Sequence, residues 1–320
     1  MTGIILLFAG RMEDDCLYGI PFTVRRYEFC IRSVRRTMRT AFLMTLLTLL
    51  LVMVGDFAGG QQGMMIMLIF SLAMNFYTYW NSDKVVLAQY RAHQVDENSA
   101  PALYGIVKRL AQRANLPMPK VYIIDDQVPN AFATGRNPQH AAVAVTTALM
   151  NYLTPKEIEG VLGHELTHVK NGDILISTVA ASLAGVITTI SRFALWFGGS
   201  RDRENSNPIA GLFFLILAPI AAALIQMAVS RSREYKADEG GGELCGNPNH
   251  LADALEKIAQ YSTRRTMRNA TEATAHMFIM CPFSAKDMQK LFSTHPSTEE
   301  RVALLRRQAE EMKRQGKLED

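Results

Sequence analysis

The chain has 320 residues, of which 48% are hydrophobic and 20% charged, and its formal net charge is +4. The positive balance is small and no basic block is interleaved with aromatic residues, so nucleic-acid binding is excluded as its main function. The four cysteines lack C-x-x-C spacing, which indicates reduced thiols in a cytosol-facing protein and argues against a disulfide framework or a zinc knuckle.

The first 37 residues have a mixed character. A short apolar stretch at positions 4–9 is followed by five arginines between Arg25 and Arg36. In a cleaved signal peptide the positive charges come before the apolar region. We therefore interpret residues 1–37 as an N-terminal extension that is poorly ordered or foreign to the natural start.

Four long apolar runs dominate the hydropathy pattern, at residues 40–58, 64–80, 174–197 and 209–229. Each approaches the roughly 20 residues that cross a bilayer as a helix. Buried core helices are the alternative, but four such runs favour an integral membrane protein with hairpins at 38–80 and 174–229. Basic residues flank the first hairpin and are missing from its connector, so both ends of this hairpin are expected in the cytosol.

Residues 81–173 are predicted to form the first part of a cytosolic catalytic domain. Helical spacing predicts a helix at 101–114, and two runs predict strands at 120–124 and 141–146. Residues 130–138 are predicted as a turn-rich link. The small and apolar residues of this link also allow an exposed sheet edge that pairs with an extended peptide, although a surface hairpin fits the spacing better.

Residues 164–168 read H-E-L-T-H, which has the form H-E-x-x-H. Thr154, Pro155 and Glu157 predict a capped helix start before it, and Gly172 predicts the helix end. Histidines four residues apart on a helix point the same way, so both imidazoles can bind one metal ion. The glutamate between them can move a proton in metal-assisted hydrolysis. Because catalytic zinc usually has three protein ligands, the motif requires a third ligand elsewhere.

A candidate for that ligand follows the second predicted hairpin, where residues 230–238 read S-R-S-R-E-Y-K-A-D. Two further crossings return this segment to the membrane side that holds His164 and His168. Glu234 and Asp238 are four residues apart, and hence on one helix face. One can bind the metal while the other accepts the N–H of a ligating histidine. The alternative is a solvated helix end beside ordinary packed histidines.

The remainder, residues 230–320, is predicted as the second part of the cytosolic domain. Asn247 and Pro248 open a helix that runs towards Tyr261. Ser297 and Glu300 have capping-box spacing at the start of a charged helix. Residues 308–320 are predicted as its fraying end.

Four segments together resemble the HtpX family of bacterial and archaeal membrane zinc metalloproteases. They read H-E-L-T-H at 164–168, S-R-S-R-E-Y-K-A-D at 230–238, N-A-F-A-T-G-R-N-P at 130–138 and T-H-P-S-T-E-E-R at 294–301. The resemblance runs from residue 38 to the C-terminus, and the family shares a wider peptidase group with the CAAX prenyl zinc proteases. It implies an α+β, mainly α-helical fold: a gluzincin-like catalytic domain with a small β-sheet, plus about four transmembrane helices.

The resemblance also implies roles for individual residues. The implied ligands of one zinc ion per subunit are His164, His168 and Glu234. Glu165 would be the general base and acid, and Asp238 would hold a ligating histidine. His295 and Arg301 would lie near the cleft and assist at the transition-state oxyanion. The edge strand that would align the substrate consists of Asn130, Ala131, Phe132, Ala133 and Thr134.

The implied function is quality control during stress, by cleavage of misfolded or damaged membrane proteins at the cytosolic face of a cytoplasmic (inner) membrane. Its partners would be protein or peptide substrates and the lipid bilayer. An intramembrane protease is one alternative, but the charges of Glu157, Lys170 and Asp173 around the motif would be costly in lipid. A prenyl-protein peptidase would have more spans. A transporter or scaffold would bind a metal without hydrolysing peptides.

Overall fold

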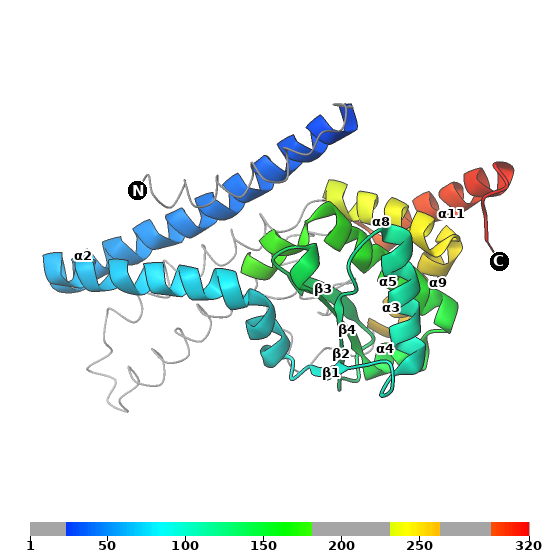
Figure 1. Cartoon of the computed structure of the whole chain (residues 1–320), viewed down its shortest axis with the longest axis horizontal. Helices are drawn as coiled ribbons and strands as arrows, with labels where there is room; N and C mark the ends of the chain where they lie inside the picture. The colour runs from blue at the N-terminus through cyan, green and yellow to red at the C-terminus, as the bar shows by residue number, and fades with distance from the viewer. Residues whose placement is uncertain (1–23, 181–230, 263–295, 320) are drawn as a thin grey trace. The chain divides into compact units, whose positions relative to one another are not determined.

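A computed structural model of the chain describes residues 24–180, 231–262 and 296–319 (Figure 1). The chain divides into two units, Met1–Arg39 and Thr40–Asp320, and the elements that position the site all belong to the second. Within the N-terminal extension, residues 24–37 are helical and form the start of helix α2, which begins at Val24. Of the third apolar run, the structure describes only residues 174–180, which are helical. The fourth run lies outside the described residues.

The first apolar hairpin lies within helix α2 (Val24–Gln89). Its backbone leaves helical dihedral angles at Gly59 and Gly60, inside the predicted connector, and the chain then runs back along itself (Figure 1). Among the described residues, one helix, Gly59–Asn81, is long and apolar enough to cross a membrane, and the apolar helix Thr40–Met53 is shorter. The two further spans predicted at 174–229 lie almost entirely outside the described residues and stay predictions.

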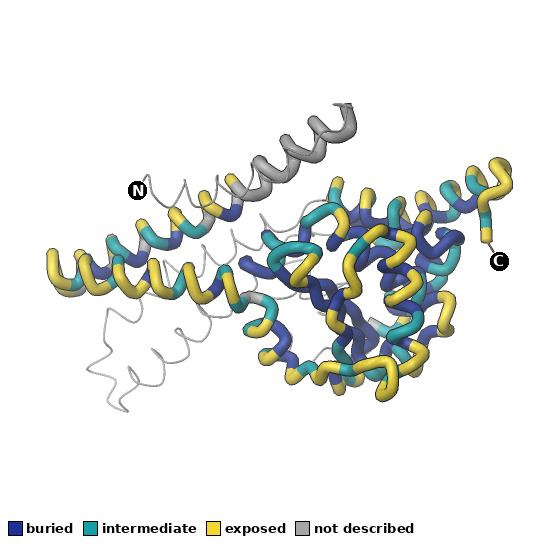
Figure 2. The backbone as a smooth tube through the Cα atoms, viewed as in Figure 1, coloured by how far each residue is buried: buried dark blue, intermediate teal, exposed yellow. Residues whose placement is uncertain are grey.

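Polar contacts join the two arms of this hairpin. Asn75 Nδ2 donates to Met44 O at 3.2 Å and to Thr48 Oγ1 at 2.8 Å. The backbones also approach closely at Gly55 and Gly63, where a Cβ on Gly63 would lie 2.2 Å from the Gly55 carbonyl oxygen. Most other large side chains of the hairpin are exposed (Figure 2). Such exposure is expected of a helix pair that faces lipid.

The second unit contains a four-stranded sheet of order β1-β2-β4-β3. Its strands are β1 (His93–Val95), β2 (Lys120–Ile124), β3 (Ala131–Gly135) and β4 (Ala141–Thr146). β2 and β4 pair in parallel, whereas β1 pairs antiparallel with β2, and β3 with β4. The strands predicted at 120–124 and 141–146 are confirmed.

The predicted turn-rich link at residues 130–138 is wrong over most of its length, whereas the edge strand that the resemblance implies at residues 130–134 is present and is displaced by one residue. Ala131–Gly135 is strand β3 at the edge of the sheet, and all five of its residues are buried. Alanine and glycine are poor strand formers, so the local signal was weak. Pairing with β4 and packing against helix α5 determine the conformation instead.

Six further helices lie wholly within the described residues, which also include the helical residues 174–180, so the described part is mainly helical α+β as predicted. They are α3 (Pro101–Ala114), α4 (Thr147–Tyr152), α5 (Pro155–Asn171), α8 (Arg231–Cys245), α9 (Pro248–Ser262) and α11 (Thr298–Arg314), and a 3-10 turn, η1 (Pro138–His140), joins β3 to β4. Helix α5 is central, since it packs against α3, α8, α9 and β3. Strands β3 and β4 and helix α5 form the buried centre of the unit (Figure 2).

The caps of α5 agree with the sequence. The Thr154 hydroxyl accepts from Glu157 N, the Glu157 carboxylate accepts from Thr154 N at 2.8 Å, and Gly172 ends the helix in the left-handed region. Burial by itself would raise the pKa of Glu157, but hydrogen bonds from Lys257 and Thr154 outweigh burial and hold it below its ordinary value. The cap therefore starts α5 at a defined residue and sets the position of the motif.

Helices α5 and α8 touch through their backbones. A Cβ on Gly241 of α8 would lie 2.6 Å from the backbone N of His164, and one on Gly163 would lie 2.8 Å from Gly241 O. Two glycines facing each other thus allow the contact that brings the start of α8 to the histidines.

The predicted fraying of residues 308–320 is wrong beyond the end of α11. Glu319 N donates to Gly246 O at 3.0 Å, and the Glu319 carboxylate accepts from Arg113 at 2.8 Å. Asn247 Nδ2 also donates to Glu319 O at 3.0 Å. These bonds anchor the tail to the turn between α8 and α9 and to α3.

Candidate metal centre

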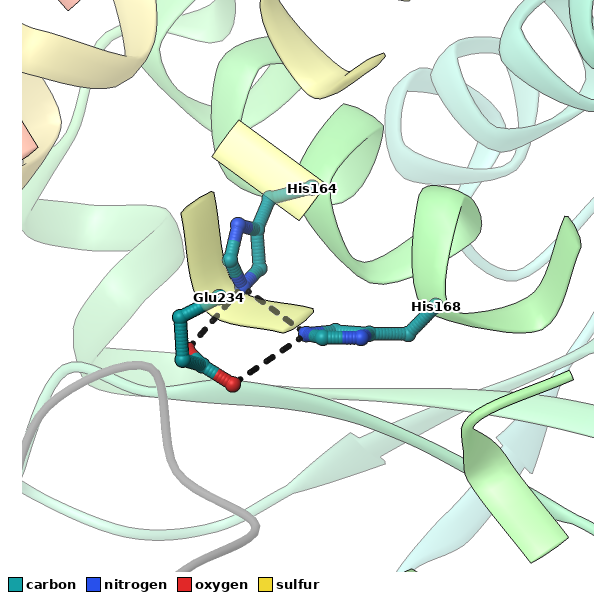
Figure 3. A group of neighbouring side chains, drawn as sticks. All are labelled: His164, His168 and Glu234. Atoms are coloured by element: carbon teal, nitrogen blue, oxygen red, sulfur yellow. Dashed lines mark hydrogen bonds and ion pairs between the residues drawn. The ribbon is translucent and has the colours of Figure 1, made fainter. Parts of the chain in front are cut away.

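Three side chains from two helices converge beside the sheet (Figure 3). His164 and His168 come from α5, and Glu234 comes from the first turn of α8. His164 Nε2 lies 3.2 Å from His168 Nε2 and 3.8 Å from Glu234 Oε2, while His168 Nε2 lies 3.6 Å from Glu234 Oε1. One ligand atom from each residue thus lies within 4.8 Å of the other two.

This arrangement fits a zinc ion. Zinc binds imidazole nitrogen and carboxylate oxygen at about 2.0–2.2 Å, so tetrahedral ligand atoms are separated by about 3.4 Å. The measured separations of 3.2 to 3.8 Å bracket that value. Two imidazoles and one carboxylate are also a donor set that zinc accepts in catalytic sites.

Behind His164 lies a buried ion pair. Asp238 Oδ1 is 2.9 Å from His164 Nδ1, the distance but not the angle of a hydrogen bond. Arg301 donates to the same carboxylate through Nε (2.8 Å to Oδ2) and Nη2 (2.6 Å to Oδ1). Burial by itself would raise the pKa of Asp238, but the Arg301 charge and hydrogen bonds hold it below its ordinary value. The carboxylate therefore stays ionised beside Nδ1 and leaves Nε2 facing the metal position.

Behind His168 lies Asp173, whose Oδ2 is 3.4 Å from His168 Nδ1. Burial lowers the pKa of His168, but the carboxylates of Asp173 and Glu234 outweigh burial and raise it to about 9. A bound divalent cation would replace the proton as the positive partner of these carboxylates. The sequence interpretation missed this role of Asp173, although its place just past Gly172, five residues after His168, was an available signal.

The Glu165 carboxylate contacts strand β3 of the sheet, whereas the carboxylates of Asp238 and Asp173 lie beside the two histidines. Its Oε2 accepts a hydrogen bond from Ala133 N of β3 at 2.9 Å, and the residue is 5% exposed. Burial raises the pKa of its carboxyl to about 7, although the nearby His168 opposes this shift. A carboxyl with this pKa can both accept and release a proton near neutral pH.

The outer edge of β3 is occupied by side-chain acceptors. N–H groups of alternate residues point away from β4. Of these, Ala131 N donates to Asn130 Oδ1 at 2.8 Å, Ala133 N to Glu165, and Gly135 N to Thr178 Oγ1 at 3.1 Å. The Thr178 contact, which the sequence interpretation missed, links the strand to the helical residues 174–180.

Arg301 and His295 are the two remaining residues that were predicted to lie near the site. Arg301 is 2% exposed and its guanidinium binds Asp238, so the structure places it in the layer behind His164 and not as a free donor in the cleft. His295 lies outside the described residues. The predicted helix α8 does carry Glu234 and Asp238 on one face, with Glu234 towards the metal position and Asp238 against His164.

Comparisons with known proteins agree with this site. The profile described as Peptidase family M48 matches residues 97–309. A protease HtpX homolog of Burkholderia thailandensis is 53% identical over 285 residues, which cover 88% of this chain and 98% of that protein. A protease HtpX homolog of Burkholderia mallei is 54% identical over 271 residues, covering 83% and 95%. The crystal structure of S. mikatae Ste24p matches with a TM-score of 0.46 and 19% identity, over 87% of this chain and 67% of that one.

Proposed function

Since the chain belongs to peptidase family M48 and to its HtpX proteases, we propose that it is a membrane zinc endopeptidase whose ligands are His164, His168 and Glu234. The single observation that carries the assignment of these residues is the convergence of Glu234 on the two imidazoles of the H-E-x-x-H helix. A bound zinc ion would supply Lewis-acid polarisation of the scissile carbonyl and lower the pKa of a water molecule.

Glu165 is the proton carrier of the proposed reaction. Its Oε2 accepts the Ala133 N–H in the substrate-free site, and a docked substrate that takes over this N–H would free the oxygen to take a proton from the attacking water. The same oxygen then delivers that proton to the leaving amide nitrogen. Burial raises the pKa of this carboxyl to about 7, which is the range in which a general base and acid works best near neutral pH.

The substrate is proposed to bind as an added strand on β3. A docked peptide would place its own carbonyl oxygens at the N–H groups of Ala131, Ala133 and Gly135, in exchange for the side-chain acceptors that hold them now. Main-chain pairing of this kind depends little on side-chain identity. It therefore suits a protease that removes misfolded or damaged membrane proteins of many sequences.

The active site is proposed to face the cytosol. The charges that flank the first hairpin place both of its ends inside, and the unit with the metal site continues directly from Asn81. Proteins that lose their fold in the membrane expose segments at this surface, where the edge strand could take them up.

The variant Glu165→Gln tests the proposal. We expect a fall of roughly 10²- to 10⁴-fold in zinc-dependent casein cleavage by detergent-purified protein, with one zinc per chain retained, because only the proton carrier is lost. Glu159→Gln is the matched control, since Glu159 lies on the same helix α5 as Glu165 but pairs with Arg109 of α3 at 3.5 Å. Undiminished cleavage by Glu165→Gln would refute the assigned role.

A further inference from the structure

The strand proposed to bind substrate is joined to the end of the membrane helix by one side chain, Arg136. Its guanidinium carbon lies 4.5 Å from the ring centroid of Trp80, and its Nη1 donates to the Trp80 carbonyl oxygen at 3.4 Å. Arg136 directly follows β3, and Trp80 lies in the last turn of the apolar helix Gly59–Asn81. The end of β3 is therefore fixed at the end of this helix.

The helix end has the composition of a membrane–water boundary. Phe76, Tyr77 and Trp80 are 69%, 58% and 39% exposed, and the Phe76 and Tyr79 rings lie 6.1 and 5.7 Å from that of Trp80. Aromatic residues gather at the headgroup level in this way. Helical geometry breaks at Asn81. Between the non-helical Gly60 and Asn81, residues 61–80 form a helix about 30 Å long, which matches the roughly 30 Å of a hydrocarbon core.

The guanidinium of Arg136 has N–H donors that its contact with Trp80 does not use. Within the part of the chain that the structure describes, no carboxylate forms an ion pair with Arg136, and its Nη1 donates to the Trp80 carbonyl oxygen. The neighbouring Asn137 Oδ1 is taken by His140, and Lys84 faces Asn81 Oδ1 at 3.4 Å. A guanidinium stacked on an aromatic face keeps its in-plane N–H fork, which matches two oxygens of a phosphate.

We propose that Arg136, held on the Trp80 ring, binds the phosphate of an anionic phospholipid headgroup. The bound lipid anchors the C-terminal end of β3 at the membrane surface. A substrate chain leaving the bilayer would then meet the edge strand where it emerges. The inference rests on the membrane location that is part of the proposed function. It adds an anionic lipid as a ligand and Arg136 as its binding residue, neither of which takes part in the protease chemistry.

Fluorescence quenching of Trp80 measures this contact directly. In the full chain carrying Trp196→Phe, Trp80 is the sole tryptophan. The protein is reconstituted into vesicles that contain brominated phosphatidylglycerol or brominated phosphatidylcholine at the same mole fraction. We expect about fivefold preferential association of Trp80 with the anionic lipid, the size of effect expected for one basic residue at a membrane surface.

In the same background, Arg136→Gln should remove this preference. Lys108→Gln should retain it, because it removes one positive charge that already faces Glu97 at 3.3 Å. Equal quenching by the two lipids in the parent, or an unchanged preference in Arg136→Gln, would overturn the proposal. Loss of the preference on addition of inorganic phosphate would overturn the lipid as the ligand.

Two further readouts separate this inference from the proposed function. If neither brominated lipid quenched the fluorescence of Trp80, the membrane location itself would be contradicted, and the inference with it. Zinc-dependent casein cleavage by the unmutated chain in the same vesicles reports the protease chemistry alone. Cleavage without any lipid preference would leave the protease assignment intact and reject only the lipid site.

Discussion

Asp238 is the residue on which the orientation of His164 depends. It is 3% exposed, lies 2.9 Å from His164 Nδ1 and pairs with Arg301 at 2.6 Å. A carboxylate in this position fixes which ring nitrogen of the histidine faces the metal. Arg301, predicted as a helper at the oxyanion, is better explained as the positive charge that keeps Asp238 ionised.

We expect Asp238→Asn to weaken zinc binding by roughly 10- to 100-fold, the usual cost of losing such a partner of a ligating histidine. Competition with a fluorescent zinc chelator measures the change. Asp253→Asn is the matched control, because Asp253 also pairs with an arginine, Arg306 at 2.6 Å, but on the surface of α9. Equal zinc affinity in the two variants would contradict the role of Asp238.

At the scale of elements, the contact between α5 and α8 determines whether the third ligand reaches the histidines. A methyl group on Gly241 would lie 2.6 Å from His164 N and 2.8 Å from its Cα. Backbone atoms cannot move aside as a side chain can, so the helices would have to separate.

Gly241→Ala should therefore destabilise the protein by about 1–3 kcal/mol or more and weaken zinc binding at the same time. Thermal unfolding with and without zinc measures both effects. Gly105→Ala is a matched control in helix α3, where the nearest atom to the added methyl is the end of the Arg109 side chain at 3.8 Å. That control should be stabilised by about 0.4–1 kcal/mol. A similar response of the two variants would contradict the close contact.

The edge strand β3 depends on Thr178 in a comparable way. The Thr178 hydroxyl accepts from Gly135 N at 3.1 Å and lies 3.0 Å from Thr134 Oγ1. We expect Thr178→Val to cost about 1–3 kcal/mol, because the buried Gly135 N–H loses its acceptor. Thr178→Ser keeps the hydroxyl and should behave like the parent in chemical unfolding. If valine and serine were equally stable there, the bond would not support the strand.

At the scale of the whole molecule, the metal position connects parts of the chain that are far apart in sequence. His168 and Glu234 are separated by 65 intervening residues, which include two apolar runs. A ligand that binds only the folded state stabilises it by about 4 kcal/mol at a thousandfold excess over its dissociation constant. The zinc ion should thus stabilise the catalytic unit as a whole.

Removal of zinc by a chelator should lower the unfolding temperature by roughly 10 °C. Glu165→Gln should show the same shift, because it keeps all three ligands, whereas Glu234→Ala should show little. Differential scanning calorimetry of the detergent-purified protein, with zinc added back, measures the difference. A chelator-dependent shift that persists in Glu234→Ala would place the ion elsewhere.

The sequence alone determined the features that depend on neighbours along the chain. The α5 caps, the strands at 120–124 and 141–146 and the pairing of the two histidines follow from cap chemistry and from local periodicity, and all are present. The resemblance of four motifs to the HtpX proteases is confirmed by the 53% identity. Only the tertiary structure decided between a turn-rich link and an edge strand at residues 131–135, and only it showed that Ala133 N donates to Glu165, that Arg301 holds Asp238, and that Asp173 and Thr178 join the site. The physical reason is that these contacts join different elements, or lie beyond a helix end, where packing rather than any sequence period decides which side chains meet.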